Sequence, residues 1–171
     1  MIETPSRIEL LAGRPLGQVG IVVADLERAL ERYSALAGVG PWQCWTYGPE
    51  SVTRLTYRGG TGDYRVRIAL SSTSPQIELL QPLEGESSHR DFLQAHGEGL
   101  HHVAVFVDSL DEAIESMAGA GYDVLQSGHG TGADGSGGFA YFDTERDLSL
   151  ILEAVEIPRR RREPELIWPG G

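Results

Sequence analysis

The feature that most constrains how this chain can fold is an internal repeat of twelve residues. The segments Gln18–Ala29 and His102–Ala113 align without gaps at an offset of 84 residues. Each begins with a stretch rich in Val or Ile, typical of a buried strand, and runs into the start of an amphipathic helix. Asp25 and Ser109 stand where the N-cap of each helix is expected. A strand followed by a helix is common in α/β proteins, but agreement over twelve positions favours the duplication of one unit.

Strand-like segments follow each predicted helix. Glycines at positions 38, 40, 119 and 121 suit the ends of the two helices. The runs that come next are 42–47, 52–57, 64–70 and 76–80 in the first half and 122–126, 139–142 and 148–155 in the second. The order βαβββ therefore occurs twice, with one additional or extended strand in the first half. A ferredoxin-like sandwich uses similar elements, and the number of strands after each helix disfavours it.

These elements divide the chain into five parts. We expect an N-terminal extension over 1–15, a first βαβββ module over 16–81, a linker over 82–99 with a short helix at about 88–96, a second module over 100–157 and a tail over 158–171. The tail contains Arg159–Arg162 and shows no periodicity, so we interpret it as solvated chain. A length of 171 residues fits one domain.

Composition excludes several classes of function. The net charge of −11 argues against nucleic-acid partners, because binding to phosphates needs a cationic surface. Cys44 is the only cysteine, so neither an internal disulfide nor a thiolate metal cage is possible. The chain has no apolar run long enough for a membrane span, and Met1–Gln18 lacks the apolar core of a signal peptide. We therefore expect a cytoplasmic protein without a membrane partner.

Four polar residues interrupt the apolar strands at positions related by the repeat. Gln18 and His102 open the two repeated strands, and Glu78 and Glu153 lie within the last strand of each half. A buried carboxylate is costly unless it is paired, protonated or bound to a cation. Each residue alone has a simpler explanation: either glutamate could face solvent, and His102 could be a core histidine whose neighbour His101 faces the opposite way. The set of four favours a site with nitrogen and oxygen ligands for one divalent metal ion, Zn, Mn, Co, Ni or Fe.

These residues resemble the vicinal oxygen chelate superfamily, which includes glyoxalase I, methylmalonyl-CoA epimerase, extradiol dioxygenases and bleomycin-resistance proteins. The resemblance covers about 16–158. Its most specific segments are Gly20–Leu26, Gln76–Pro82, Phe92–Val103 and Phe139–Thr144. It implies an α+β fold in which two tandem βαβββ modules form a curved, mostly antiparallel eight-stranded sheet around a central cavity.

The resemblance also implies the ligand set Gln18, Glu78, His102 and Glu153. This order of Gln, Glu, His and Glu is similar to that of animal-type glyoxalase I, whereas the epimerases have His at the first position. The places that match the glutathione-binding residues of glyoxalase I hold Val22, Pro82 and Glu98, which disfavours glutathione. A dioxygenase iron site of the His, His, Glu kind would need His at position 18.

The chemistry implied is proton transfer next to a carbonyl group that the metal holds. Glu153 is the first candidate for the catalytic base, by similarity to glyoxalase I. Asp63 is the second, because it stands near the position of a catalytic glutamate in the epimerases, although it could equally be a turn residue after Gly62. The expected partners are a small-molecule carbonyl or acyl-CoA-like substrate and a second copy of the chain in a homodimer.

A second class of function stays open, in which the same fold binds a small molecule without turnover, as in resistance proteins. The aromatic residues Trp42, Trp45, Tyr47 and Tyr57 are candidates for an apolar pocket. Arginines at positions 54, 58, 65 and 67 could hold an anion, although the pattern is more typical of a solvated face.

Overall fold

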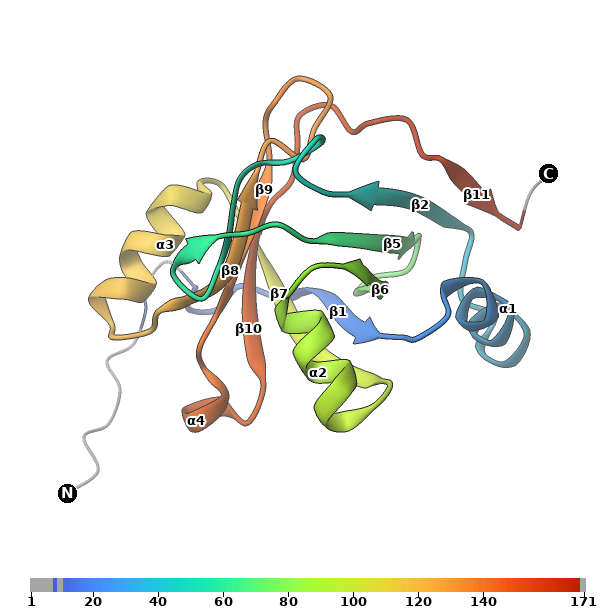
Figure 1. The fold of residues 1–171 in the computed structure, drawn as a ribbon, viewed down its shortest axis with the longest axis horizontal. Helices are drawn as coiled ribbons and strands as arrows, with labels where there is room; N and C mark the ends of the chain where they lie inside the picture. The colour runs from blue at the N-terminus through green and yellow to red at the C-terminus, as the bar shows by residue number, and fades with distance from the viewer. Residues whose placement is uncertain (1–7, 9–10, 170–171) are drawn as a thin grey trace.

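The two repeated strands, β1 (Leu16–Val22) and β7 (Gly99–Val107), pair antiparallel at the centre of one sheet. This sheet is seen in a computed structural model that describes residue 8 and residues 11–169. Outward from β1 the order is β6, β5 and β2, and outward from β7 it is β10, β9 and β8. Figure 1 shows the two groups of strands running in different directions, so that the sheet curls. The expected α+β class is confirmed, and the duplication of a module stays a prediction.

The bounds of the remaining elements follow the sequence closely in most places. The other strands are β2 (Trp42–Tyr47), β3 (Thr53–Tyr57), β4 (Gly60–Thr61), β5 (Arg65–Ser71), β6 (Gln76–Glu84), β8 (Val124–His129), β9 (Gly138–Phe142), β10 (Ile151–Glu156) and β11 (Leu166–Trp168). The helices are α1 (Leu26–Ala37), α2 (Ser88–His96), α3 (Leu110–Gly119) and α4 (Glu145–Leu148). The short α4 was not predicted, and it takes up Leu148, which we had assigned to the last strand.

The expected number of eight strands is wrong, because the sheet has eleven. Of the strands beyond eight, β3 corresponds to the additional strand expected at 52–57 in the first half, whereas β4 and β11 match no predicted strand. All three lie toward the ends of the sheet. β3 pairs with β8, and β11 pairs with β2. The chain leaves β2 at one end of the sheet and enters β3 at the other, so residues 48–52 cross between the two ends. Pairing with β3 and β11 covers the edges of β8 and β2, which would otherwise expose unpaired backbone groups.

The region that we predicted as a tail without regular structure contains β11. Leu166 pairs with Cys44 and Trp168 with Trp42, which extends the sheet beyond β2. The predicted extension over 1–15 lies largely outside the described residues. Two of its members, Ile8 and Leu11, pack against the hydrophobic cluster beneath α3.

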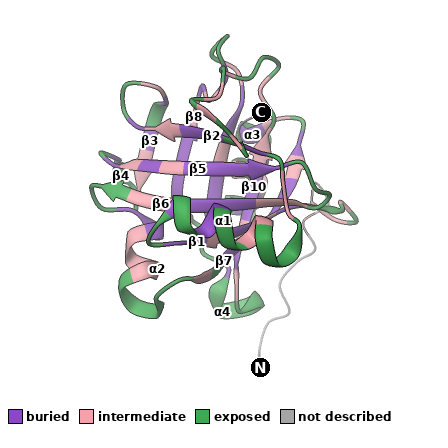
Figure 2. Cartoon of the chain, turned by 90° about the vertical axis from the view of Figure 1, so that its right-hand side faces the viewer, coloured by how far each residue is buried: buried purple, intermediate pink, exposed green. Residues whose placement is uncertain are grey.

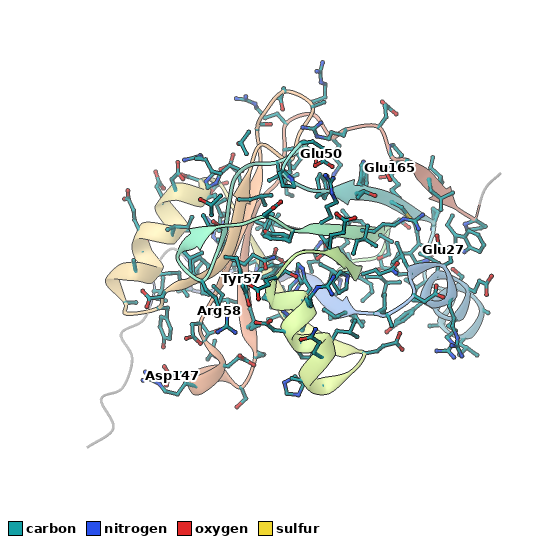
Figure 3. All side chains as sticks on the ribbon, in the orientation of Figure 1. Glu27, Glu50, Tyr57, Arg58, Asp147 and Glu165 are labelled. Carbon is teal, nitrogen blue, oxygen red and sulfur yellow. The ribbon has the colours of Figure 1, made fainter. Side chains whose placement is uncertain are left out.

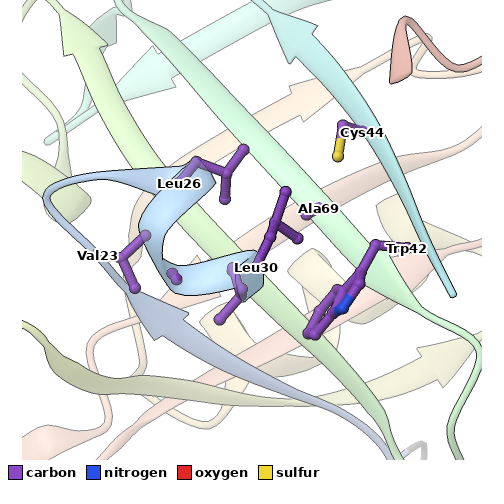
Figure 4. Close-up of a cluster of buried hydrophobic side chains, with 8 residues drawn as sticks. Val23, Leu26, Leu30, Trp42, Cys44 and Ala69 are labelled. Carbon is purple, nitrogen blue, oxygen red and sulfur yellow. The ribbon is translucent and has the colours of Figure 1, made fainter. Parts of the chain in front are cut away.

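Helices α1 and α3 cover the outer face of the curled sheet, each over one half of the strands (Figure 1). Asp25 accepts a hydrogen bond from the backbone N–H of Arg28, and Ser109 accepts one from Glu112, as the cap positions predict. Figure 4 shows the cluster under α1, where Leu26 and Leu30 meet Trp42. Leu36, in the last turn of α1, is 87% exposed because it lies at the margin of the apolar face of the helix.

Helix α2 packs against the concave side of the sheet. Phe92 and Leu93 contact a cluster that includes Val22, Trp45 and Leu80. Buried residues run along the central strands in Figure 2, whereas exposed residues gather on the helices and loops. The concave face therefore has its own core, and the functional site lies within it. Among the described residues, no helix is both long and apolar enough to cross a membrane.

Candidate metal centre

Strand register brings the four predicted ligands to one face of the sheet. Gln18 of β1 lies opposite Ala104 of β7, which in turn lies opposite Glu153 of β10. One step along the strands, Gly20 of β1 lies between Glu78 of β6 and His102 of β7. Residues two apart on a strand share a face, so all four side chains are on the same side. All four are buried, with exposed fractions of 7% or less.

Gly20 creates the space that His102 fills. A Cβ atom at position 20 would lie 1.9 Å from Cε1 and 2.2 Å from Nε2 of the His102 ring. The imidazole therefore lies directly over the glycine backbone and reaches across β1 toward Glu78 on β6. A glycine within a strand often marks such a close approach.

Three buried ligand atoms lie close together without forming hydrogen bonds of acceptable geometry to one another. Nε2 of His102 lies 3.1 Å from Oε2 of Glu153 and 3.3 Å from Oε2 of Glu78. None of these three atoms has a hydrogen-bond partner of acceptable geometry. Ligand atoms about 2.0–2.2 Å from one zinc ion lie about 3.0–3.5 Å apart, which matches these separations. The three residues could therefore hold one metal ion, and their donor set suits it.

Gln18 is oriented by a chain of amide hydrogen bonds. Its Nε2 donates to Oε1 of Gln76 at 3.1 Å, and Nε2 of Gln76 donates to the backbone oxygen of Ser71 at 3.1 Å. The amide oxygen of Gln18 accepts no hydrogen bond from the described residues, and it is available as a fourth ligand.

His101 does not face away from the site as we expected. The pairing of β1 with β7 shifts between Gly20 and Ile21, which leaves His101 as an additional residue in a β-bulge. Its Nδ1 lies 3.0 Å from Nδ1 of His102. Bulges interrupt the alternation of side chains and often occur beside functional sites. Burial, followed by the nearby imidazoles, holds the pKa of His101 well below its usual range, so the ring is neutral.

The Nδ1 of a neutral His101 can accept a hydrogen bond from the Nδ1–H of His102, which leaves the lone pair on Nε2 of His102 free for a metal. Such a hydrogen bond to the other ring nitrogen commonly fixes the tautomer of a metal-binding histidine. Next to this pair, Nε2 of His89 lies 3.1 Å from the hydroxyl of Tyr141. Burial lowers the pKa of His89 to about 3, so this ring is also neutral.

The ionisation of His102 depends on the two carboxylates. Burial by itself lowers the pKa of His102, but Glu153 and Glu78 outweigh it and raise the pKa to about 9 when no metal is bound. Burial also raises the pKa of Glu153. A protonated imidazole between two carboxylates thus supplies positive charge that a bound divalent ion would otherwise supply.

The metal-free protein is therefore expected to lose stability in alkaline solution. Because folding raises the pKa of His102 from about 6.5, its stabilising contribution is complete below pH 6.5 and disappears as the pH rises through 9. Urea unfolding of chelator-treated protein between pH 6.5 and 9.5 should show this decline, which the His102→Gln variant should lack. An equal decline in both proteins would contradict this assignment.

A cavity of about 80 Å³ opens from this cluster toward the surface. Its walls carry Gln18, Glu78, Glu153 and Tyr141 together with apolar residues of β5, β6 and β10. Arg161 is the only exposed residue among those that line the cavity, so the cavity opens to solvent beside Arg161. The volume has room for a few water molecules or the reacting end of a small substrate.

The structure does not bring Asp63 to this cluster. Asp63 is exposed, and it is the neighbouring Tyr64 that lines the cavity. Of the four aromatic residues proposed for an apolar pocket, Tyr47 lines the cavity, whereas Trp42 lies under α1 and the hydroxyl of Tyr57 donates to Asp91.

The strand arginines that we considered as an anion site are engaged on the outer surface. Arg58 pairs with Asp91, Arg65 with Glu50 and Arg67 with Glu27, and Arg54 lies 3.9 Å from Asp111. The side chains of Arg58, Glu50 and Glu27 are 67%, 53% and 54% exposed, and Figure 3 shows Arg58 beside Tyr57 and Glu27 at α1. The interpretation as a solvated face fits these contacts.

Tyr141 and His89 are site residues that we did not predict. Tyr141 lies opposite Glu153 in the pairing of β9 with β10, so strand alternation could have placed it. His89 reaches the cavity from α2, and no periodicity in the sequence indicates that contact.

Comparison with known families identifies the family of this chain. The Glyoxalase/Bleomycin resistance protein/Dioxygenase superfamily matches residues 17–142, and the chain belongs to it. This confirms the resemblance to vicinal oxygen chelate proteins.

The individual relatives are distant. A Bacillus subtilis protein, the uncharacterised YqjC, is 24% identical over 141 residues, which are 82% of this chain and 91% of YqjC. Methylmalonyl-CoA epimerase from Mycobacterium tuberculosis has a TM-score of 0.62 at 24% identity, covering 87% of this chain and 93% of the epimerase. A Streptomyces coelicolor methylmalonyl-CoA epimerase variant in complex with 2-nitronate-propionyl-CoA has a TM-score of 0.62 at 23% identity, covering 84% and 96%. At these sequence identities, the comparison shows that this chain and the two epimerases share a fold.

Proposed function

We propose that this protein binds one divalent metal ion through Gln18, Glu78, His102 and Glu153 and catalyses proton transfer at a carbon next to a carbonyl group. The observation that carries the proposal is the convergence on one point of three buried ligand atoms, none of which makes a hydrogen bond of acceptable geometry. Two buried carboxylates beside one imidazole carry excess negative charge, and a divalent cation is the natural compensation.

A bound ion would supply Lewis acidity that makes the C–H bond next to the carbonyl more acidic. The chain supplies the base. We assign this role to Glu153, because its carboxylate is 3% exposed and lines the cavity. Burial raises the pKa of Glu153 and so makes the carboxylate a stronger base.

Other residues position the reaction. Tyr141 lies opposite Glu153 and carries a hydroxyl whose pKa burial holds well above its ordinary value, so it stays protonated. The hydroxyl can donate a hydrogen bond as negative charge develops on the substrate. The apolar walls, including Val66, Ile68 and Leu80, limit the access of water to the carbanion.

The substrate class that we favour is an acyl-CoA thioester or a related carbonyl compound. Its support is the likeness to methylmalonyl-CoA epimerases, of which one structure is described in complex with methylmalonyl-CoA and ammonium. The second candidate, non-catalytic binding of a small molecule, is favoured by the apolar lining of the cavity. Ring cleavage is disfavoured, because Gln18 replaces the histidine that such an iron site needs.

We also propose that two chains, each with two modules, form a homodimer. Light scattering, which measures the mass of the particle in solution, tests this proposal.

Deuterium wash-in separates the two candidates. Metal-loaded protein in D₂O is incubated with methylmalonyl-CoA and with a panel of other acyl-CoA thioesters and 2-oxo acids, and exchange at the carbon next to the carbonyl is followed by mass spectrometry. Catalysed exchange above the rate without protein is expected for at least one compound. Binding of panel compounds without exchange would favour the non-catalytic function.

A further inference from the structure

A strap formed by residues 158–165 crosses the opening of the cavity, from the end of β10 toward β11. Figure 1 shows it passing over the top of the sheet. The backbone N–H of Ala133 donates to Arg160, and the indole N–H of Trp45 donates to the backbone oxygen of Arg162. At its far end the N–H of Glu165 donates to Cys44. These bonds fix the strap at three points.

The four consecutive arginines of the strap have different surroundings. Arg159 pairs with Asp134 at 3.3 Å, Arg160 donates to the backbone oxygen of Ala133, and Arg162 donates to that of Ser51 at 2.8 Å. The guanidinium of Arg161, in contrast, makes no hydrogen bond or ion pair within the part of the chain that the structure describes. It lies 6.0 Å from the centre of the Trp45 ring and lines the cavity. Its five N–H groups are available to a ligand.

The residues that line the cavity include three carboxylates and one permanently positive side chain. Glu78 and Glu153 lie at the metal centre, Glu156 accepts a hydrogen bond from the backbone N–H of Leu110, and Arg161 carries the positive charge. Tyr47 lines the same cavity, and its hydroxyl donates to none of the described residues. Burial raises the pKa of Tyr47, and the positive charges of Arg161 and Arg162 oppose this shift.

We infer that Arg161 and the Tyr47 hydroxyl form an anion subsite at the mouth of the cavity, which holds a negatively charged group at the far end of the substrate. The inference rests on the proposed function and narrows it. The substrate would be a carbonyl compound that carries a second anionic group, a carboxylate or a phosphate. Guanidinium groups bind both through paired, charge-assisted hydrogen bonds. The carbonyl end then points to the metal centre and the anionic end to solvent.

Matched pairs of 2-oxo acids test the subsite by isothermal titration calorimetry of metal-loaded protein. The dicarboxylates oxaloacetate, 2-oxoglutarate and 2-oxoadipate are each compared with the monocarboxylate of equal length, namely 2-oxobutanoate, 2-oxopentanoate and 2-oxohexanoate. The series covers different spans between the metal centre and Arg161. Phosphonopyruvate replaces the distal carboxylate of oxaloacetate by a phosphonate and so distinguishes the two anions. At least one compound with a distal anionic group should bind about tenfold or more tightly than the monocarboxylate of equal length.

The Arg161→Gln variant should abolish this preference and leave the affinity for the monocarboxylates within about twofold. Arg160→Gln is the matched control, because Arg160 is adjacent but contacts only a backbone oxygen, and it should keep the preference. Equal affinity within every pair, or a preference that survives in Arg161→Gln, would overturn the subsite alone. Metal-loaded wild-type protein that binds none of the 2-oxo acids would likewise overturn the subsite. Failure of the wild-type protein to take up metal would overturn the proposed function, and the subsite with it.

Discussion

The Gly20→Ala variant is expected to lose metal affinity by about 100-fold or more, although no ligand is changed. The added methyl group would overlap the His102 ring at 1.9 Å. Gly20 pairs with β6 on one side and β7 on the other, so the backbone has little freedom to move away. The imidazole must therefore rotate out of line with Glu78 and Glu153. Loss of ligand orientation typically costs 10–100-fold in metal affinity, and displacement of the ligand itself costs more.

Competition titrations with a fluorescent zinc chelator measure this loss. Overpacking should also lower the free energy of unfolding by about 1–3 kcal/mol, so folding is checked by circular dichroism. Gly119→Ala is the control, because a Cβ at the end of α3 has no neighbour within 4 Å. Its metal affinity should equal that of the wild type. Wild-type affinity in Gly20→Ala would show that His102 is not held over Gly20 in solution.

The Glu153→Gln variant is expected to lose catalysed deuterium exchange by at least about 100-fold, the scale of a lost general base. The amide keeps an oxygen that can act as a ligand, as we propose for Gln18, so bound metal should fall less than in Glu153→Ala. Measuring metal in the same samples allows the exchange rate to be expressed per loaded site. The variant thus separates the two roles that we assign to this carboxylate.

Glu156→Gln provides the matched control on the same strand. Glu156 also lines the cavity, and its Oε2 accepts a hydrogen bond from the backbone of Leu110, which a glutamine oxygen can still accept. Exchange should stay within about twofold of the wild type. Exchange by Glu153→Gln at the wild-type rate would mean that another group removes the proton.

The four proposed ligands could be predicted because they follow the regular alternation of strands. Glu78 and Glu153 are carboxylates in otherwise apolar runs, and the repeat relates His102 to Gln18. Regular periodicity was enough to place these side chains on one face. His101 was misplaced because a β-bulge, which depends on the pairing partner, breaks that alternation.

Contacts between distant segments account for what the sequence did not reveal. The strand β11 forms because Leu166–Trp168 finds an unpaired edge on β2, more than 100 residues earlier in the chain. The four arginines of the strap have the same chemistry in the sequence, and only their surroundings distinguish Arg161 from Arg159 and Arg162. Asp63 was a candidate by position, and the structure leaves it exposed in the segment between β4 and β5.

Elemental analysis of protein purified without chelators tests the metal centre most directly. Wild-type protein, loaded in turn with Zn, Mn, Co, Ni and Fe and then desalted, should retain close to one ion per chain for at least one of these metals. His102→Ala and Glu78→Ala, with circular dichroism spectra like that of the wild type, should retain almost none. Wild-type protein that holds none of the five metals, or variants that hold as much as the wild type, would contradict the metal centre.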